Sequence, residues 1–98
     1  MKSSRPPSFS RALRAIRNAR GLPQEAFDLV SSRTYVSALE RNLKEPTLSK
    51  VTELAMVCKV HPLTMLALSY CASAKPAELD RLMARVKKEV EELGLSDI

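Results

Sequence analysis

Two stretches decide how this chain folds: residues 13–25 read LRAIRNARGLPQE, and residues 32–41 read SRTYVSALER. The first carries apolar side chains at helical spacing up to Gly21, and glycine commonly follows the last residue of a helix. The second opens with Ser32, a residue type that caps helix N-termini, and keeps apolar side chains on one face. The pattern predicts two helices separated by a short connecting segment.

Helical periodicity extends outward from these stretches in both directions. Apolar side chains recur three and four residues apart, and there is no alternating run of β-branched residues and no Asn-Gly hairpin signal. Ser8, Thr47 and the His61-Pro62 pair suit helix starts. We therefore expect an all-α chain. The expected helices span about residues 9–20, a short segment after Pro23, and residues 33–41, 48–58, 62–70 and 76–93.

The composition excludes several classes of protein. The chain has 98 residues, 45% of them hydrophobic, which suits one domain with one core. No apolar run approaches the roughly 18 residues of a membrane span, and no secretory signal is present, so we expect a cytoplasmic protein without membrane contact. With Cys58, Cys71 and a single histidine, the chain cannot easily supply the roughly four ligands of a zinc site. We expect no metal, no cofactor and buried thiols, with redox sensing by a cysteine as the alternative.

The net charge of +5 is unevenly distributed along the chain. Residues 1–24 contain basic side chains and no acidic one. The basic residues are Lys2, Arg5, Arg11, Arg14, Arg17 and Arg20. A concentrated basic segment is typical of a surface that meets phosphate. A solvated face without a partner is the alternative, and charge alone does not separate the two.

The last expected helix carries an apolar seam. Its members alternate four and three residues apart, which is a heptad spacing. They are Leu79, Met83, Val86, Val90 and Leu93. Such a seam has to be buried, either against the chain's own core or against a second copy. We favour the second copy, so residues 72–98 are predicted to be a dimerisation element.

The two opening stretches, together with PTL at residues 46–48, resemble the phage-repressor-like (Xre/Cro-type) helix-turn-helix family. The features that carry the resemblance occur in order: Arg-x-x-x-Gly-Leu-x-Gln, Tyr-Val-Ser-x-Leu-Glu-Arg and Pro-Thr-Leu. The resemblance covers about residues 9–71. It implies a five-helix repressor-like DNA-binding domain over residues 1–71, followed by an additional C-terminal helix. It also implies that the third helix is the recognition helix.

The resemblance assigns a role to each candidate DNA-binding residue. It implies that Gln24 holds a backbone phosphate and braces the recognition helix, and that Arg17 and Glu40 form an ion pair between the first and third helices. The residues implied to reach base edges are Ser32, Arg33 and Thr34, with Ser37 and Ala38 one turn further on. The residues implied to contact phosphates are Arg41, Asn42 and Lys44. Tyr35 is either a core residue or a contact to the DNA backbone.

The side-chain chemistry of the recognition helix fits base reading. Arg33 has a planar fork that can pair with O6 and N7 of guanine, worth about 1–3 kcal/mol of discrimination. Thr34 can serve a polar base edge or a thymine methyl, whereas Ala38 can only pack, for example against a thymine methyl. The alternative for Arg33 is a solvated helix-start residue. Arg11, Arg14 and Arg20 are expected to form a general electrostatic surface.

The sequence departs from the family pattern in three places. The segment over residues 27–32 is about two residues shorter than usual and has no glycine, so the second helix is either clipped or crosses the third differently. Pro23 replaces the usual capping serine or threonine. Asn42 replaces a common glycine after the third helix, and asparagine tolerates the left-handed conformation.

These observations predict a sequence-specific transcriptional regulator that binds double-stranded DNA and acts as a homodimeric repressor. Its two half-sites would lie roughly 34 Å apart. The alternative is a protein-interaction module with the same fold, such as an antitoxin-like protein or an adaptor, that does not read DNA. An enzyme is not expected, because no nucleophile and base are paired and no glycine-rich phosphate loop is present.

Overall fold

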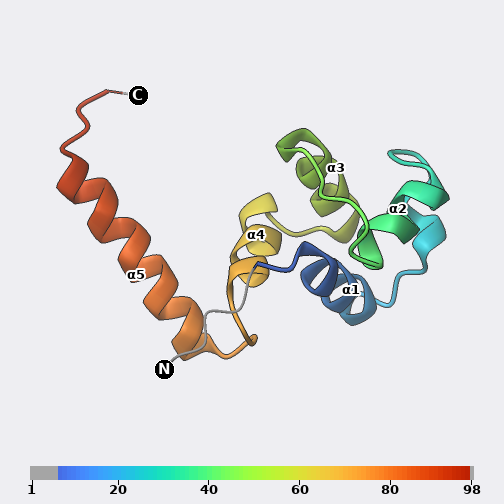
Figure 1. Cartoon of the computed structure of the whole chain (residues 1–98), viewed down its shortest axis with the longest axis horizontal. Coiled ribbons are helices and arrows are strands. Elements are labelled where there is room, and N and C mark those ends of the chain that lie inside the picture. The colour runs from blue at the N-terminus through green and yellow to red at the C-terminus, as the bar shows by residue number, and fades with distance from the viewer. Residues whose placement is uncertain (1–6, 98) are drawn as a thin grey trace.

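The helices begin where the sequence supplies polar caps or prolines. The computed structural model describes residues 7–97. Its elements are α1 (Phe9–Ala19), the 3₁₀ turn η1 (Gln24–Phe27), α2 (Arg33–Glu40), α3 (Leu48–Cys58), α4 (Pro62–Tyr70) and α5 (Pro76–Leu93), as Figure 1 shows. The described range contains no strand, and the expectation of an all-α chain is confirmed.

Side-chain caps at the N-termini of α1 to α4 agree with the sequence prediction. In each case a side-chain atom of the preceding residue accepts a backbone N–H of the first turn. The pairs are Ser8 with Arg11 (3.3 Å), Ser32 with Tyr35 (3.1 Å), Thr47 with Lys50 (3.1 Å) and His61 Nδ1 with Leu63 (2.9 Å). Pro62 occupies the first helical turn of α4, where its missing N–H costs no hydrogen bond.

The segment after Pro23 differs most from a regular helix. It forms a single 3₁₀ turn of four residues, Gln24–Phe27, without a side-chain cap. The shortened, glycine-free connection leaves room for only this turn before Ser32 starts α2. The second helix of the family pattern is therefore clipped, one of the two alternatives that the sequence left open. The other predicted ends agree to within one residue, since α1 ends at Ala19 and α2 at Glu40.

Residues in the left-handed conformation follow the ends of α1, α2 and α3. Gly21 follows α1 with φ +69°, and Asn42 follows α2 with φ +61°. Asn42 thus adopts the conformation expected of it in place of glycine. Lys59 ends α3 with φ +60°, which sequence did not predict, and the Val60 N–H there donates to the Ala55 carbonyl at 3.1 Å.

A single apolar core lies between α1, η1, α2, α3 and α4. The largest fully buried side chains are Phe27, Leu13, Leu39, Leu54, Met65, Val36, Val51 and Cys58. Helix α1 packs against both α2 and α4, and α3 packs against α4 (Figure 1). Phe27 is completely buried, so the short η1 turn still anchors the connection to α2.

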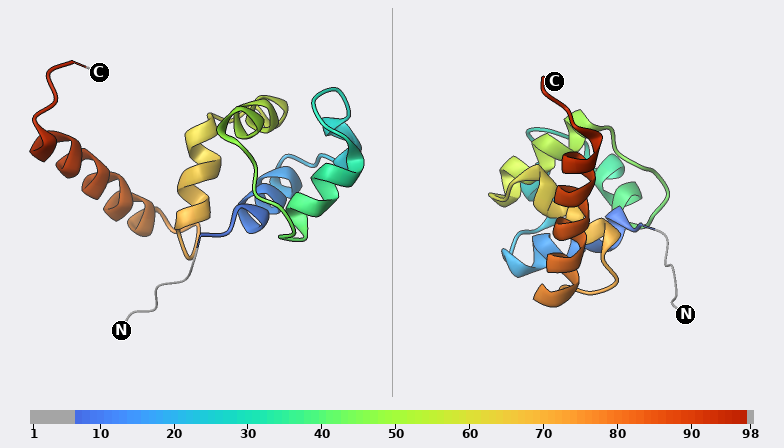
Figure 2. Two further views of the ribbon diagram at one scale, coloured as in Figure 1. Left: turned by 45° about the horizontal axis from the view of Figure 1, so that its top comes forward. Right: turned by 90° about the vertical axis from the view of Figure 1, so that its left-hand side faces the viewer.

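Helix α5 projects from this body, and none of its residues is buried. Figures 1 and 2 show that it leaves the linker beside the end of α4 and then diverges from it. It packs against the rest of the protein mainly through α4. The linker is held to α5 by Glu78, whose carboxylate accepts the backbone N–H groups of Ala72 and Ser73.

Three further observations bear on the classes considered above. Among residues 7–97, no group of His, Cys, Asp or Glu side chains is arranged to hold a metal ion. No single helix in that range is long and apolar enough to cross a membrane; α3 and α4 meet the criterion only when counted together, and they are bent by 108°. Cys58 and Cys71 are free and buried, which confirms the expectation for both thiols.

Candidate nucleic-acid interface

The N-terminal turn of α2 is exposed. Ser32 caps it, and Arg33 and Thr34 occupy its first two positions with their side chains outside the core. The Arg33 side chain is 58% exposed. A polar, exposed helix start of this kind is the part of a recognition helix that can reach base edges.

Two carboxylates lie beside Arg33. Its Nη2 atom is 3.7 Å from Oε2 of Glu25, in η1, and 4.0 Å from Oδ2 of Asp28, which ends that turn. Both carboxylates are about half exposed, so each pair contributes little to stability. The sequence analysis missed them, because no regular helical spacing links residues 25 and 28 to residue 33.

The C-terminal end of α2 is held by a buried ion pair. Glu40, 5% exposed, accepts hydrogen bonds from Nε of Arg17 at 2.6 Å and from Nη2 at 2.9 Å. The predicted Arg17–Glu40 ion pair is confirmed. Burial opposes ionisation of Glu40, but the hydrogen bonds from Arg17 and Gln24 outweigh it and lower its pKa. The hydrogen bond to Glu40 correspondingly raises the pKa of Arg17.

Gln24 belongs to the same network. Its Nε2 donates to Oε1 of Glu40 at 3.0 Å, which ties η1 to the last residue of α2. The bracing role expected of Gln24 is thus confirmed by a direct contact. Its expected contact with a phosphate remains a prediction.

Ala38 is not available to DNA. It is 7% exposed and faces the core, so the expectation that it packs against a thymine methyl is wrong. The physical reason is the orientation of α2, which turns this position inward together with Val36 and Leu39. Tyr35 is half-buried against the core, and Nζ of Lys50 lies 5.8 Å from its ring centroid. Of the two alternatives for Tyr35, its packing supports the role of a core residue.

The residues at the far end of α2 form a second exposed group. Arg41, Asn42 and Lys44 are exposed there, and Nε of Arg41 donates to Oγ of Ser37 at 3.3 Å. Because an eight-residue helix is about 12 Å long, this group lies about two turns from Arg33. The structure therefore separates the candidate residues into a group at the start of α2 and a group at its end.

Two arginines of the basic N-terminal segment bind backbone carbonyls at the C-terminal ends of other helices. Arg11 Nη2 donates to the carbonyls of Leu68 and Cys71, at the end of α4. Arg20 donates to the carbonyls of Cys58 (2.9 Å) and Lys59 (3.1 Å), at the end of α3. The expectation of a general electrostatic surface is corrected for Arg11, which is half-buried, whereas Arg20 is exposed and also binds the end of α3. Unpaired carbonyls at helix ends attract cations of this kind.

The other basic residues of this segment differ from that pair. Arg14 is exposed. Arg17 is the structural partner of Glu40 and also donates to the Leu22 carbonyl at 2.8 Å. Lys2 and Arg5 lie outside the described residues.

The predicted seam lies along α5 and is progressively uncovered. Leu79 is half-buried, whereas Met83, Val86, Val90 and Leu93 are 37%, 43%, 52% and 67% exposed. The increase follows the divergence of α5 from α4 (Figure 1). Most of the seam is therefore an exposed apolar face in the isolated chain.

Comparison with known proteins identifies one family. The family model described as helix-turn-helix matches residues 13–64, which is more than half of the chain and includes α2 and α3. A similar solved structure is that of the restriction-modification controller protein C.AhdI from Aeromonas hydrophila. It has a TM-score of 0.56 and 30% sequence identity, over 59% of this chain and 91% of that one. Among curated proteins, no match was found.

Proposed function

The chain belongs to the helix-turn-helix family, and on this premise we propose that it is a sequence-specific regulator of transcription that binds double-stranded DNA as a homodimer. In this proposal residues 1–71 form the DNA-binding domain, and α2 enters the major groove. Residues 72–98 pair two copies. The controller function named for C.AhdI supports a regulatory role, and the binding mode proposed here requires no cofactor.

The exposed first turn of α2 is the observation that carries this proposal. A major groove about 12 Å wide admits one helix, and recognition helices contact base edges with their N-terminal residues. Arg33 and Thr34 occupy those positions and are exposed, while the hydrogen bond of Gln24 to Glu40 keeps η1 and α2 in a fixed arrangement. Arg33 is therefore the residue we expect to pair with a guanine.

Glu25 and Asp28 would sharpen the preference of Arg33 for its specific base over DNA of other sequences. Their carboxylates lie within 4.0 Å of its guanidinium, and they would face the same duplex that Arg33 approaches. Negative charges repel backbone phosphates of every sequence, so they weaken non-specific binding. When Arg33 binds a base, it gives up its two weak ion pairs with Glu25 and Asp28. Two hydrogen bonds to a guanine offset this loss, and the weaker contact with another base does not.

The group at the end of α2 fits the role of phosphate contacts. Arg41 and Lys44 carry exposed positive charges, and Asn42 presents an exposed amide. Such contacts position a protein on the duplex without reading sequence. Because one module makes few base contacts, two modules joined through α5 would gain affinity by binding both half-sites at once.

The test begins with selection of binding sites from a random duplex library, followed by titration of the selected and a scrambled duplex. Arg33→Ala should reduce the preference for the selected duplex by about fivefold or more for each half-site, since a bidentate guanine contact is worth about 1–3 kcal/mol. Arg41→Ala should weaken both duplexes about equally. Arg85→Ala, on the outer face of α5, is the matched control and should leave both affinities unchanged.

Two results would contradict the proposal. Unchanged preference in Arg33→Ala would move base reading to another surface. Absence of binding to any duplex, with the protein folded by circular dichroism, would instead favour the alternative of a protein-interaction module such as an antitoxin-like protein or an adaptor.

A further inference from the structure

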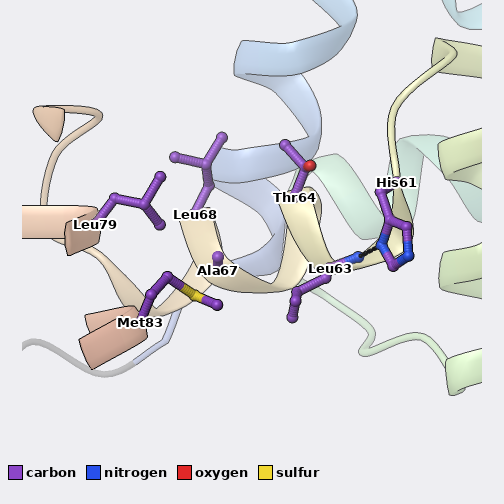
Figure 3. A pocket seen from close by; sticks show the side chains of 7 residues that line it. All are labelled: His61, Leu63, Thr64, Ala67, Leu68, Leu79 and Met83. Carbon is purple, nitrogen blue, oxygen red and sulfur yellow. Dashed lines mark hydrogen bonds between the residues drawn. The ribbon is translucent and has the colours of Figure 1, made fainter. Parts of the chain in front are cut away.

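An apolar groove lies between α4 and α5. Two adjoining pockets of about 400 and 350 Å³ share Leu63, Ala67 and Met83 as lining residues. Figure 3 shows that Leu79 and Met83 of α5 face Leu68 and Ala67 of α4 across the first of them. We call this feature the α4–α5 groove. The two helices that form it diverge toward the C-terminal end of α5 (Figures 1 and 2).

Both walls of the groove leave large apolar side chains uncovered. Leu63 and Tyr70 on α4 are 47% and 66% exposed, and the seam of α5 continues past the groove through Val90 and Leu93. Contiguous apolar surface of this kind on a small protein marks an interaction site. A helix with an apolar stripe is the complementary shape for such a groove.

We propose that the α4–α5 groove is occupied by α5 of a second copy, running antiparallel to the first. This inference rests on the proposed homodimer and specifies how its two halves fit. The seam of α5 is both a wall of the groove and the apolar stripe needed to fill it, so a two-fold axis satisfies both copies. Helices α4 and α5 of the two copies then form a four-helix bundle.

Charge determines the direction and register of the pair. With Met83 and Val90 at a positions and Val86 at d, Asp80 and Lys87 both occupy e positions, beside the seam. In an antiparallel pair the e positions of the two helices face each other. When Met83 lies opposite the second copy's Val86, Asp80 lies beside the second copy's Lys87, and the symmetry repeats this contact.

Other arrangements of the same seam lack this attraction. If the antiparallel pair shifts by one heptad in one direction, Lys87 lies beside the second copy's Lys87. If it shifts in the other direction, Asp80 lies beside the second copy's Asp80. In both cases like charges repel. In a parallel pair e positions face g positions, so Lys87 meets Leu82 and forms no ion pair.

The ion pairs within α5 support the same assignment. Glu89, at a g position beside the seam, is already paired with Arg85 at 3.0 Å, and on the outer face Lys88 pairs with Glu92 at 3.9 Å. Over residues 7–97, neither Asp80 nor Lys87 takes part in an ion pair within the chain. With Glu89 paired within its own helix, Asp80 and Lys87 are the charges beside the seam that a second copy would pair.

The experiment is sedimentation equilibrium of the full chain, with a charge swap in α5. Asp80→Lys and Lys87→Asp, made singly, should each weaken dimerisation about tenfold, because two attractive contacts become repulsive. The double variant D80K/K87D should restore the wild-type association. Arg81→Glu, on the outer face, is the matched control and should leave association unchanged. Leu63→Ser should also weaken the dimer if α4 is part of the docking surface.

The outcomes separate this inference from the dimer itself. A dimer that neither single variant weakens, or that the double variant does not restore, overturns the antiparallel pairing while leaving the homodimer in place. A charge-swap pattern as expected, with no effect of Leu63→Ser, overturns docking in the groove. A chain that stays monomeric at all concentrations overturns both the dimer and the inference, while the DNA-binding test on Arg33 stands apart from either.

Discussion

Arg17 of α1 and Glu40 of α2 form a two-point ion pair in the interior, with nitrogen–oxygen distances of 2.6 and 2.9 Å. The two residues are 23 positions apart, and their contact joins the first helix to the end of the proposed recognition helix. Gln24 donates to the same carboxylate at 3.0 Å. One buried carboxylate and its two donors therefore connect the end of α2 to α1 and to η1, in addition to the apolar packing of Val36 and Leu39.

Removing one partner of this ion pair should destabilise the fold strongly. Arg17→Met leaves Glu40 charged, 5% exposed and without its cation, so we expect a loss of about 3 kcal/mol in the free energy of unfolding. Urea titration followed by circular dichroism measures it. Arg85→Met is the control, because it removes an ion pair whose arginine side chain is 77% exposed and should cost less than about 1 kcal/mol. Equal losses in the two variants would contradict a structural role for Arg17.

The lowered pKa of Glu40 predicts acid sensitivity. A carboxyl whose pKa is lower in the folded state stabilises the fold above its unfolded pKa, about 4.3 for glutamate, and loses that contribution as the pH falls through the lowered value. Stability should therefore be constant near neutral pH and decrease below about pH 4. Glu78, whose pKa is lowered by backbone N–H groups of Ala72 and Ser73, contributes with the same sign. Urea titrations at successive pH values should give a shallower acid slope in Glu40→Gln, and an unchanged slope would count against this assignment.

Neutralising the two carboxylates beside Arg33 should strengthen binding to DNA of any sequence. The double variant Glu25→Gln, Asp28→Asn removes negative charge within 4.0 Å of the guanidinium, so affinity for a random duplex should rise several-fold. Preference for the selected duplex should fall at the same time. Fluorescence anisotropy at several salt concentrations measures both, with Asp97→Asn near the C-terminus as the charge-matched control for a single neutralisation. An unchanged affinity for the random duplex would show that these residues do not face DNA.

The hydrogen bonds of Arg20 predict a stability effect at the end of α3. Arg20→Ala removes donors to the carbonyls of Cys58 and Lys59, and we expect a loss of about 1 kcal/mol in the free energy of unfolding. Arg14→Ala, on the same helix and exposed, should change stability by less than about 0.5 kcal/mol. Thermal unfolding of both variants at equal concentration tests the difference. Similar unfolding midpoints for the Arg20→Ala and Arg14→Ala variants would show that the hydrogen bonds of Arg20 do not stabilise the fold.

The buried thiols should be unreactive in the folded protein. Burial is the main cause that raises the pKa of Cys58 and of Cys71, so neither forms much thiolate at neutral pH. Ellman's reagent should label both only after denaturant is added. Rapid labelling of either thiol under native conditions would favour the redox-sensing alternative.

Much of the helical structure could be predicted because it depends on near neighbours. The caps formed by Ser8, Ser32 and Thr47 each involve an N–H three residues further on, and the left-handed turn at Asn42 follows from that residue's own tolerance. The exposure of Arg33 followed from its position at a helix start. The inward turn of Ala38 could not be predicted, since it depends on how α2 rotates against the rest of the core.

The sequence by itself determined where most of the helices begin and end, because capping and helical periodicity act over about four residues. Its resemblance to a known family, and not that periodicity, indicated a helix-turn-helix protein. Only the tertiary structure decided that Arg11 and Arg20 bind helix-end carbonyls, and that Glu25 and Asp28 flank Arg33. These contacts depend on the crossing of helices and on the clipped η1 turn. Such geometry arises when the whole core packs, and no local pattern of residues specifies it.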